Sequence, residues 1–134
     1  MQRVYLRVFL AVLAVAFILP QLGCGGADGP EMGDVQGTVT LEGQPLPSAQ
    51  VIFQPTNGRP STGITDDQGK YELQFTTDRS GALAGSHQVK ITTAIDLPDD
   101  TRAAEVVPAQ YNRQSDLVRE VKPGPNTIDF DLEK

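Results

Sequence analysis

Apolar and polar residues alternate along most of the chain after residue 34. In the segment 35–41 (VQGTVTL), Val35, Val39 and Leu41 share one face and threonines lie on the other. A period of two in segments rich in β-branched residues is typical of half-buried β-strands. The same pattern predicts further strands over residues 49–55, 61–65, 70–76, 86–95, 116–122 and 126–132.

Short segments rich in glycine, proline and aspartate separate these predicted strands. Glycine accepts a positive φ and proline cannot donate to a β-ladder, so such segments are typical of turns. Short strands at this regular spacing predict an all-β fold, a seven-stranded antiparallel Greek-key sandwich. The aromatic residues in phase with apolar neighbours are expected in its core: Phe53, Tyr71, Phe75 and Phe130.

The beginning of the chain has a different pattern. Two arginines precede an uncharged apolar run of 12 residues, 8–19. A helix needs about 20 apolar residues to cross a membrane, so this shorter run is typical of a signal-peptide helix. We predict a lipoprotein signal peptide over 1–23, a flexible glycine-rich tether over 24–33 and a single domain over 34–134.

Cys24 is the only cysteine and directly follows the predicted signal peptide. The sequence around it resembles a bacterial lipobox, in which the cysteine is lipidated and becomes the first residue of the mature chain. Gln21 and Leu22 stand where that motif has an aliphatic and a small residue. Two alternatives stay open: lipidation of Cys24, which several acyl chains would make a stable anchor, or ordinary cleavage that leaves Cys24 unmodified.

A chain beginning at Cys24 keeps nine basic and 17 acidic residues, a net charge of −8. This charge disfavours binding to nucleic acid or to anionic lipid headgroups. We therefore expect an exported, membrane-anchored lipoprotein of a bacterial cell envelope, facing the periplasm or the surface. Its expected partners are the membrane, through the lipid on Cys24, and an envelope protein or glycan, with no cofactor.

The predicted domain resembles, over essentially all of residues 34–132, the carboxypeptidase regulatory-like domain, a transthyretin-like sandwich. The resemblance rests on GTVTLEGQPLPSAQVIFQP (37–55), GITDDQGKYEL (63–73) and GSHQVKI (85–91). Small planctomycete-type lipoproteins of this kind continue with features also present here: Pro108, Tyr111-Asn112 and the pattern V-x-x-G-x-N-x-x-x-F-x-L over 121–132. The resemblance implies a sandwich that acts as an accessory module, without peptidase activity.

Asp66 and Asp67 are the first candidates for a metal site. A calcium loop of the EF-hand type needs oxygen ligands at alternate positions and a glutamate at the twelfth. Counted from Asp66, Lys70 and Thr77 stand at the fifth and twelfth positions. Neighbouring side chains on a strand also point to opposite faces. The pattern favours a hairpin turn that uses Gly69, with Asp66 and Asp67 as weak metal candidates.

His87 is the only histidine, and its parity with Val89 and Ile91 places it on the buried face. A zinc site would then need carboxylates for all its other ligands, which is unusual. Ser86 would point away from His87, and no serine lies in a G-x-S-x-G elbow. We predict no catalytic residue. A small-ligand or metal carrier and a cryptic hydrolase remain the alternatives to an interaction module.

The segment 96–115 is the longest stretch without a strand pattern. Irregular loops of about 20 residues in compact domains are usually functional or disordered. We expect the contact residues of the protein here: Asp99, Asp100, Tyr111, Asn112 and Arg113. The alternative for Tyr111 is that its ring packs on the edge of the sandwich and pins the loop.

Overall fold

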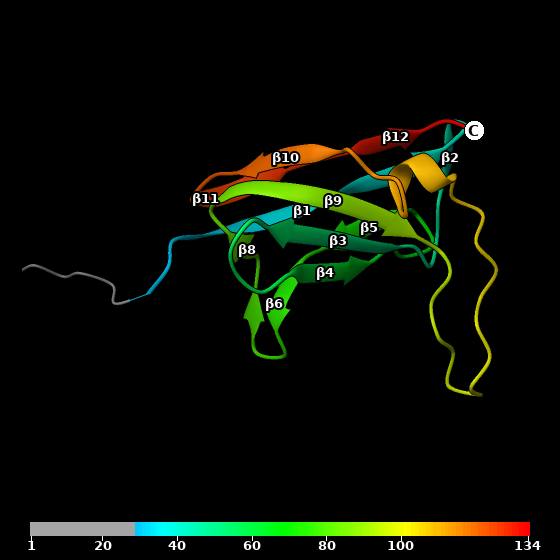
Figure 1. The fold of residues 1–134 in the computed structure, drawn as a ribbon, viewed down its shortest axis with the longest axis horizontal. Helices are drawn as coiled ribbons and strands as arrows, with labels where there is room; N and C mark the ends of the chain where they lie inside the picture. The colour runs from blue at the N-terminus through cyan, green and yellow to red at the C-terminus, as the bar shows by residue number, and fades with distance from the viewer. Residues whose placement is uncertain (1–28) are drawn as a thin grey trace, which may run out of the picture.

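The computed structural model describes residues 29–134 as a sandwich of two β-sheets (Figure 1). The predicted signal peptide, Cys24 and most of the predicted tether lie outside the described residues. The strands of the first sheet are β1 (Met32–Leu41), β2 (Gln44–Pro45), β5 (Lys70–Glu72), β8 (Ala82–Leu83), β11 (Gly124–Thr127) and β12 (Phe130–Leu132). Those of the second are β3 (Gln50–Pro55), β4 (Ser61–Ile64), β6 (Gln74–Thr76), β7 (Arg79–Ser80), β9 (Gly85–Thr92) and β10 (Val118–Val121).

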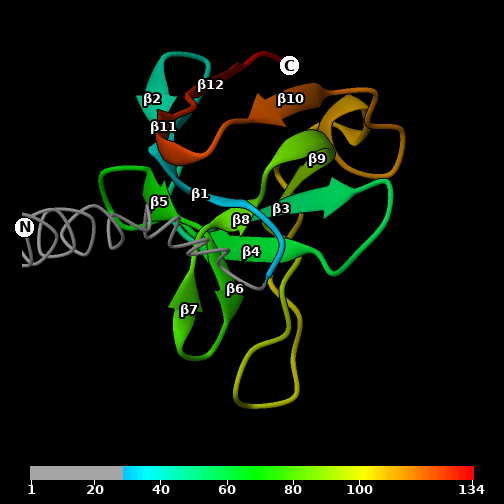
Figure 2. The ribbon, with the colours of Figure 1, turned by 90° about the vertical axis from the view of Figure 1, so that its left-hand side faces the viewer.

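The second sheet has the order β10-β9-β3-β4-β6-β7, and each of its pairings is antiparallel. Figure 2 shows its strands following one another from β10 to β7. In the first sheet β1 is central, with β2, β5 and β8 antiparallel on one side. On its other side β11 and β12 run parallel to it, so the last strands of the chain lie beside the first. The predicted all-β sandwich is confirmed, although these two pairings are parallel.

The inward faces of both sheets form one hydrophobic core. The predicted parity is confirmed for Val39, Phe53 and Ile91, which are fully buried, and for Phe130. The Phe130 ring lies edge-on to the Phe53 ring, with centroids 6.2 Å apart. The core placement of Phe75 was wrong, because this residue is only half-buried at the margin of the second sheet.

Phe75 misses the core because the chain changes sheets at Leu73. The predicted strand 70–76 is divided into β5, which pairs with β1, and β6, which pairs with β4. Leu73 lies at the crossing, fully buried, and its N–H donates to the carbonyl of Val35 at 2.9 Å. The period of two therefore does not continue on the same face beyond Leu73.

Tyr71 on β5 shows how the core accommodates a polar group. Its hydroxyl donates to the carbonyl oxygen of Ile128 at 2.6 Å, so the one polar atom of the side chain is paired. Burial raises the pKa of Tyr71, the nearby Asp129 raises it further, and Arg119 opposes the change. The hydroxyl therefore remains a donor at any physiological pH.

The segment 65–70 is a tight turn, as predicted. One carboxylate oxygen of Asp66 accepts hydrogen bonds from the N–H groups of Gln68 and Lys70, both at 2.9 Å. Gly69 has a φ of +74°, and its carbonyl accepts from the Val39 N–H at 2.8 Å. The Asp66 side chain thus holds the turn, and Gly69 connects it to β1.

Gly69→Ala is expected to destabilise the protein more than Gly43→Ala. Both glycines have similar positive φ values, +74° and +77°, which cost an alanine about 1–2 kcal/mol. Only at Gly69 would the new Cβ also lie 2.4 Å from a backbone atom, the Val39 carbonyl oxygen. Disturbing that contact should add about 1–3 kcal/mol. Urea unfolding of both variants measures the difference, and equal losses would contradict the steric explanation.

No helix in residues 29–134 is long and apolar enough to cross a membrane.

Candidate functional site

The long connection between β9 and β10, residues 93–117, begins as a narrow hairpin that extends beyond the sandwich (Figure 1). Asp96 and Arg102 form an isolated antiparallel bridge at its middle. At the tip, the Asp99 carboxylate accepts hydrogen bonds from the side chain and the N–H of Thr101. These bonds lower the pKa of Asp99, the side-chain bond most. Asp99 and Asp100, two predicted contact residues, are therefore exposed at the tip of a hairpin that its own side chains order.

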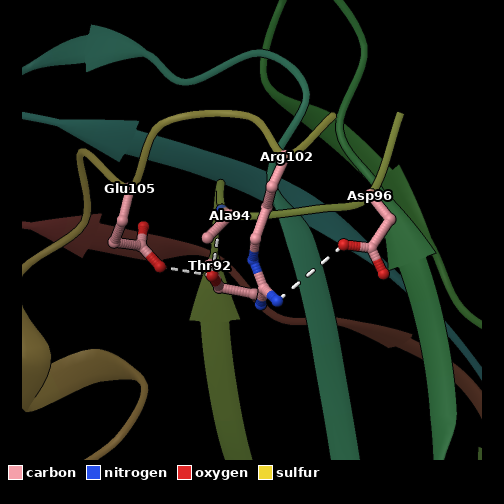
Figure 3. A network of polar contacts seen from close by, with 5 residues as sticks. All are labelled: Thr92, Ala94, Asp96, Arg102 and Glu105. Carbon is pink, nitrogen blue, oxygen red and sulfur yellow. Dashed lines mark hydrogen bonds and ion pairs between the residues drawn. The ribbon is translucent and has the colours of Figure 1, made fainter. Parts of the chain in front are cut away.

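Glu105 fixes the returning strand of this hairpin to β9. Its carboxylate accepts a hydrogen bond from the Thr92 hydroxyl (Figure 3). It also accepts from the N–H and hydroxyl of Thr93, both at 3.0 Å, and from the Val107 N–H at 3.0 Å. Desolvation raises the pKa of Glu105, but these hydrogen bonds together outweigh it and hold the pKa below its usual value. The negative charge of Glu105 is thus stabilised by neutral donors.

Replacing Glu105 by glutamine is expected to lower the Tm at neutral pH. The amide NH₂ of glutamine cannot accept the hydrogen bond that the Thr92 hydroxyl donates to Oε2. Its neutral oxygen accepts the bonds from Thr93 and Val107 more weakly than a carboxylate oxygen does. Because folding lowers the pKa of Glu105, its stabilisation is complete above the unfolded carboxyl pKa of about 4.3. It is lost as the pH falls through the lower folded-state pKa. The Tm difference between the wild type and Glu105→Gln should therefore be largest near pH 7 and shrink in acid.

Thermal melts at pH 7, 5, 4 and 3 measure this difference. Glu120→Gln is the control, since Glu120 is exposed on β10. A Tm difference for Glu105→Gln that stays constant down to pH 3 would contradict the assignment.

Tyr111 and Asn112 hold the other end of the connection. They lie at the end of the 3₁₀ helix η1 (Ala109–Tyr111). The Asn112 side chain is buried, and its NH₂ donates to the carbonyls of Ile91 and Val107 at 3.3 and 3.2 Å. The Tyr111 ring packs against the core, and its hydroxyl accepts from the Glu133 N–H at 3.1 Å. The interpretation that Tyr111 pins the loop is confirmed, and Asn112 shares this structural role.

A cleft of about 550 Å³ lies between the connection and the outer face of the second sheet. Ile52 on β3 and Thr92 on β9 contribute to its floor, and Val107 lines the side formed by the connection. Three cationic side chains border it: Lys90, Arg102 and Arg113. The structure thus brings the predicted contact residue Arg113 together with residues that the sequence did not single out.

Only part of this cleft could be predicted from the sequence. Lys90 and Thr92 have the parity opposite to Val89 and Ile91, which predicts that they point outward. Their register against Gln50 and Ile52 could not be read from the sequence. The approach of Arg102 and Arg113 depends on how the connection folds back, which no local pattern records.

The remaining sequence candidates do not line this cleft. His87 is fully buried, as predicted, and its Nε2 lies 2.6 Å from the carbonyl oxygen of Leu83. Its Nδ1 and the Ser61 hydroxyl are the buried side-chain atoms in residues 29–134 that lack a hydrogen-bond partner. Ser86 is exposed, on the opposite face of β9. Within the same residues, Asp66 and Asp67 belong to no group of three His, Cys, Asp or Glu side chains that could hold a metal ion.

No family model matches the sequence, and no curated protein matches it. Among solved structures, the chain is similar to a DUF3823 family protein from Parabacteroides merdae, with a TM-score of 0.47 and 10% sequence identity. The match covers 78% of this chain and 47% of that one, so the chain spans about half the length of that protein.

Proposed function

We propose that this protein is a lipid-anchored, exported β-sandwich module without catalytic activity. It is held to a membrane through Cys24 and presents its long connection to an envelope protein or glycan. The observation that carries this proposal is the placement of two segments. β1 begins at one end of the sandwich, and the hairpin around Asp99 extends from the other end (Figure 1). An anchor upstream of β1 would therefore direct this hairpin away from the membrane.

The construction of the connection supports a role in recognition. Its base is fixed to the sandwich by Glu105 and Asn112, while its tip at Asp99 and Asp100 is exposed. Binding residues are often found on loops that a rigid scaffold positions. The connection has this form, with an ordered base and a polar tip.

The placement of His87 supports the absence of catalysis. A general base must reach the proton that it removes, directly or through one water. His87 is fully buried and lies next to the Phe53 ring, with centroids 5.7 Å apart. Ser86, its neighbour in sequence, faces the opposite side of the sheet. This arrangement lacks the contact between nucleophile and base that a hydrolase of the serine type needs.

The anchor is tested by the intact mass of the protein purified from its native membranes. We expect a chain that begins at Cys24 and carries added acyl mass. Cys24→Ser should move the protein from the membrane fraction to the soluble fraction. A chain without acyl mass, or an unchanged distribution of Cys24→Ser, would refute lipid anchoring.

The role of the hairpin is tested by shortening only its outer part. Replacement of residues 97–101 by two glycines leaves Glu105 and Asn112 in place, so the base of the connection is preserved. We expect a protein or glycan that co-purifies with the wild type to be lost. The same replacement at 56–59, an exposed loop after β3, is the control. Retention of the co-purifying partner by the 97–101 variant would refute this role.

The cleft supports a second candidate, a carrier of a small ligand. Its volume of about 550 Å³ is within the range of about 300–1,000 Å³ for small-molecule sites. A carrier should gain Tm with its ligand, since binding to the native state stabilises that state. It should also keep that gain when residues 97–101 are replaced.

A further inference from the structure

We infer that the cleft between β9 and the long connection binds a carboxylate group of an acidic glycan. This rests on the proposed function, because it names the ligand of a non-catalytic binding module. The first observation is the concentration of charge. Of the nine basic residues that follow Cys24, three border this one cleft: Lys90, Arg102 and Arg113. The rest of the chain is strongly acidic, so the cleft is a local exception.

The positive charges of the cleft are little compensated. Within residues 29–134 the structure contains one ion pair, between Arg102 and Asp96 at 3.8 Å. Both side chains are mostly exposed, 68% and 86%, and such pairs contribute little. Glu105, the acidic residue that lines the cleft, directs its carboxylate to neutral donors on Thr92, Thr93 and Val107. No carboxylate in residues 29–134 forms an ion pair with Lys90 or Arg113, so the cleft keeps an excess of positive charge although Glu105 lines it.

The cations come from separate segments. Lys90 lies on β9, Arg102 on the returning strand of the hairpin and Arg113 directly after η1 and Asn112. A group that enters the cleft is therefore approached from different directions. The planar guanidinium of arginine matches a carboxylate with two parallel hydrogen bonds. This arrangement fits a compact anionic group, whereas the overall negative charge opposes a long polyanion such as nucleic acid.

The surface beside the cleft has the chemistry of a sugar-binding face. Ile52 in the floor is paired in register with Lys90 on one side and Thr62 on the other. Gln50 lies between Thr92 and the exposed Ile64. Amide and hydroxyl groups thus alternate with aliphatic side chains. The polar groups can form hydrogen bonds with the hydroxyl groups of a sugar, and the aliphatic side chains can pack against the C–H face of its ring. The cleft volume of about 550 Å³ leaves room for one or two sugar rings.

A peptide fits this surface less well. Extended peptides are commonly bound by adding a strand to a free sheet edge. β9 is paired with β10 and β3, and β3 with β9 and β4. The floor of the cleft therefore offers side chains but no free strand edge, which favours a glycan over an acidic peptide.

The test is calorimetric titration of the full-length protein in a non-ionic detergent with tetragalacturonate. The control ligand is the same oligomer with its carboxyl groups methyl-esterified, which removes the charge and keeps the rings. We expect binding of the acidic oligomer only, weakened by added salt. Arg102→Gln and Arg113→Gln should each weaken it by about tenfold or more, as expected for loss of a charge-assisted hydrogen bond. Arg79→Gln, an exposed position on β7, should change the Kd by less than about twofold.

Several results would overturn the inference. Tetragalacturonate would not bind, or its methyl ester would bind equally well. Alternatively, the Arg102→Gln and Arg113→Gln variants would keep both the wild-type Tm and the wild-type affinity. Galacturonate monomer bound as tightly as the tetramer would indicate a small-ligand carrier instead. An acidic peptide bound more tightly than the oligomer would also refute a glycan site.

The two proposals fail separately. The module itself is tested by membrane attachment through Cys24 and by loss of a partner when residues 97–101 are replaced. That replacement keeps Arg102 and Arg113, so it leaves the cations of the cleft in place. An anchored protein that does not bind the oligomer overturns only the glycan site. A protein that binds the oligomer but carries no lipid overturns only the anchor.

Discussion

Replacing Phe130 by alanine is expected to lower the free energy of unfolding by about 3–5 kcal/mol. Phe130 is 2% exposed and lies where the two sheets meet. Its ring contacts the rings of Phe53 and Tyr71, with centroids 6.2 and 6.3 Å away, and the guanidinium of Arg119 lies 5.2 Å from its centroid. Alanine removes all these contacts and leaves a cavity that the paired strands around it cannot easily close.

Equilibrium unfolding in urea measures the loss, and Phe75→Ala is the matched control. Phe75 has the same side chain but is only half-buried on β6, so its replacement should cost less than half as much. A loss below about 1 kcal/mol for Phe130→Ala would be inconsistent with a core ring. Equal losses in the two variants would mean that burial does not separate them.

Gly37→Ala is expected to be at least as damaging, although it adds only one methyl group. A Cβ at Gly37 would lie 1.8 Å from the carbonyl oxygen and 2.6 Å from the carbonyl carbon of Ile128. That backbone cannot move freely. The Ile128 N–H donates to Gln36 at 2.8 Å, and its carbonyl accepts from the Tyr71 hydroxyl at 2.6 Å. Separation of β1 from the β11–β12 junction would break both bonds, at a cost of about 3–5 kcal/mol.

Gly29→Ala is the control for this variant, because no atom lies within 4 Å of the position its Cβ would take. The free energy of unfolding should fall sharply for Gly37→Ala and remain within about 0.5 kcal/mol of the wild type for Gly29→Ala. A stable Gly37→Ala variant would show that the parallel pairing of the C-terminal strands with β1 adjusts more freely than the structure indicates.

Much of the fold could be predicted because strand burial is a local property. Successive side chains of a strand point to opposite faces, so the spacing of Val51, Phe53, Val89 and Ile91 is sufficient to identify their buried face. Turn chemistry is local as well. The Asp66 side chain binds backbone groups two and four residues further on, which is why the turn at Gly69 was correctly predicted.

The sequence predictions were wrong or silent where the local pattern does not specify the partner of a strand. The alternation of residues 70–76 continues through Leu73, but the chain there leaves the first sheet and enters the second. Phe75 therefore keeps the parity of a core residue without its burial. The parallel pairing of β11 and β12 with β1 joins residues about 90 positions apart, and neither segment carries a signal for the direction of its partner.

The sequence by itself determined the strand pattern, the buried faces, the turn at Gly69 and the acidic charge of the chain, since each depends on neighbouring residues or on composition. Only the tertiary structure decided which predicted loop residues face solvent. It placed the Asn112 amide inside the protein and brought Lys90, Arg102 and Arg113 around one cleft. The physical reason is that such contacts depend on how the connection folds back on β9. That path is fixed by the bonds that Glu105 accepts from Thr93 and that Asn112 donates to the Ile91 carbonyl, 21 residues away.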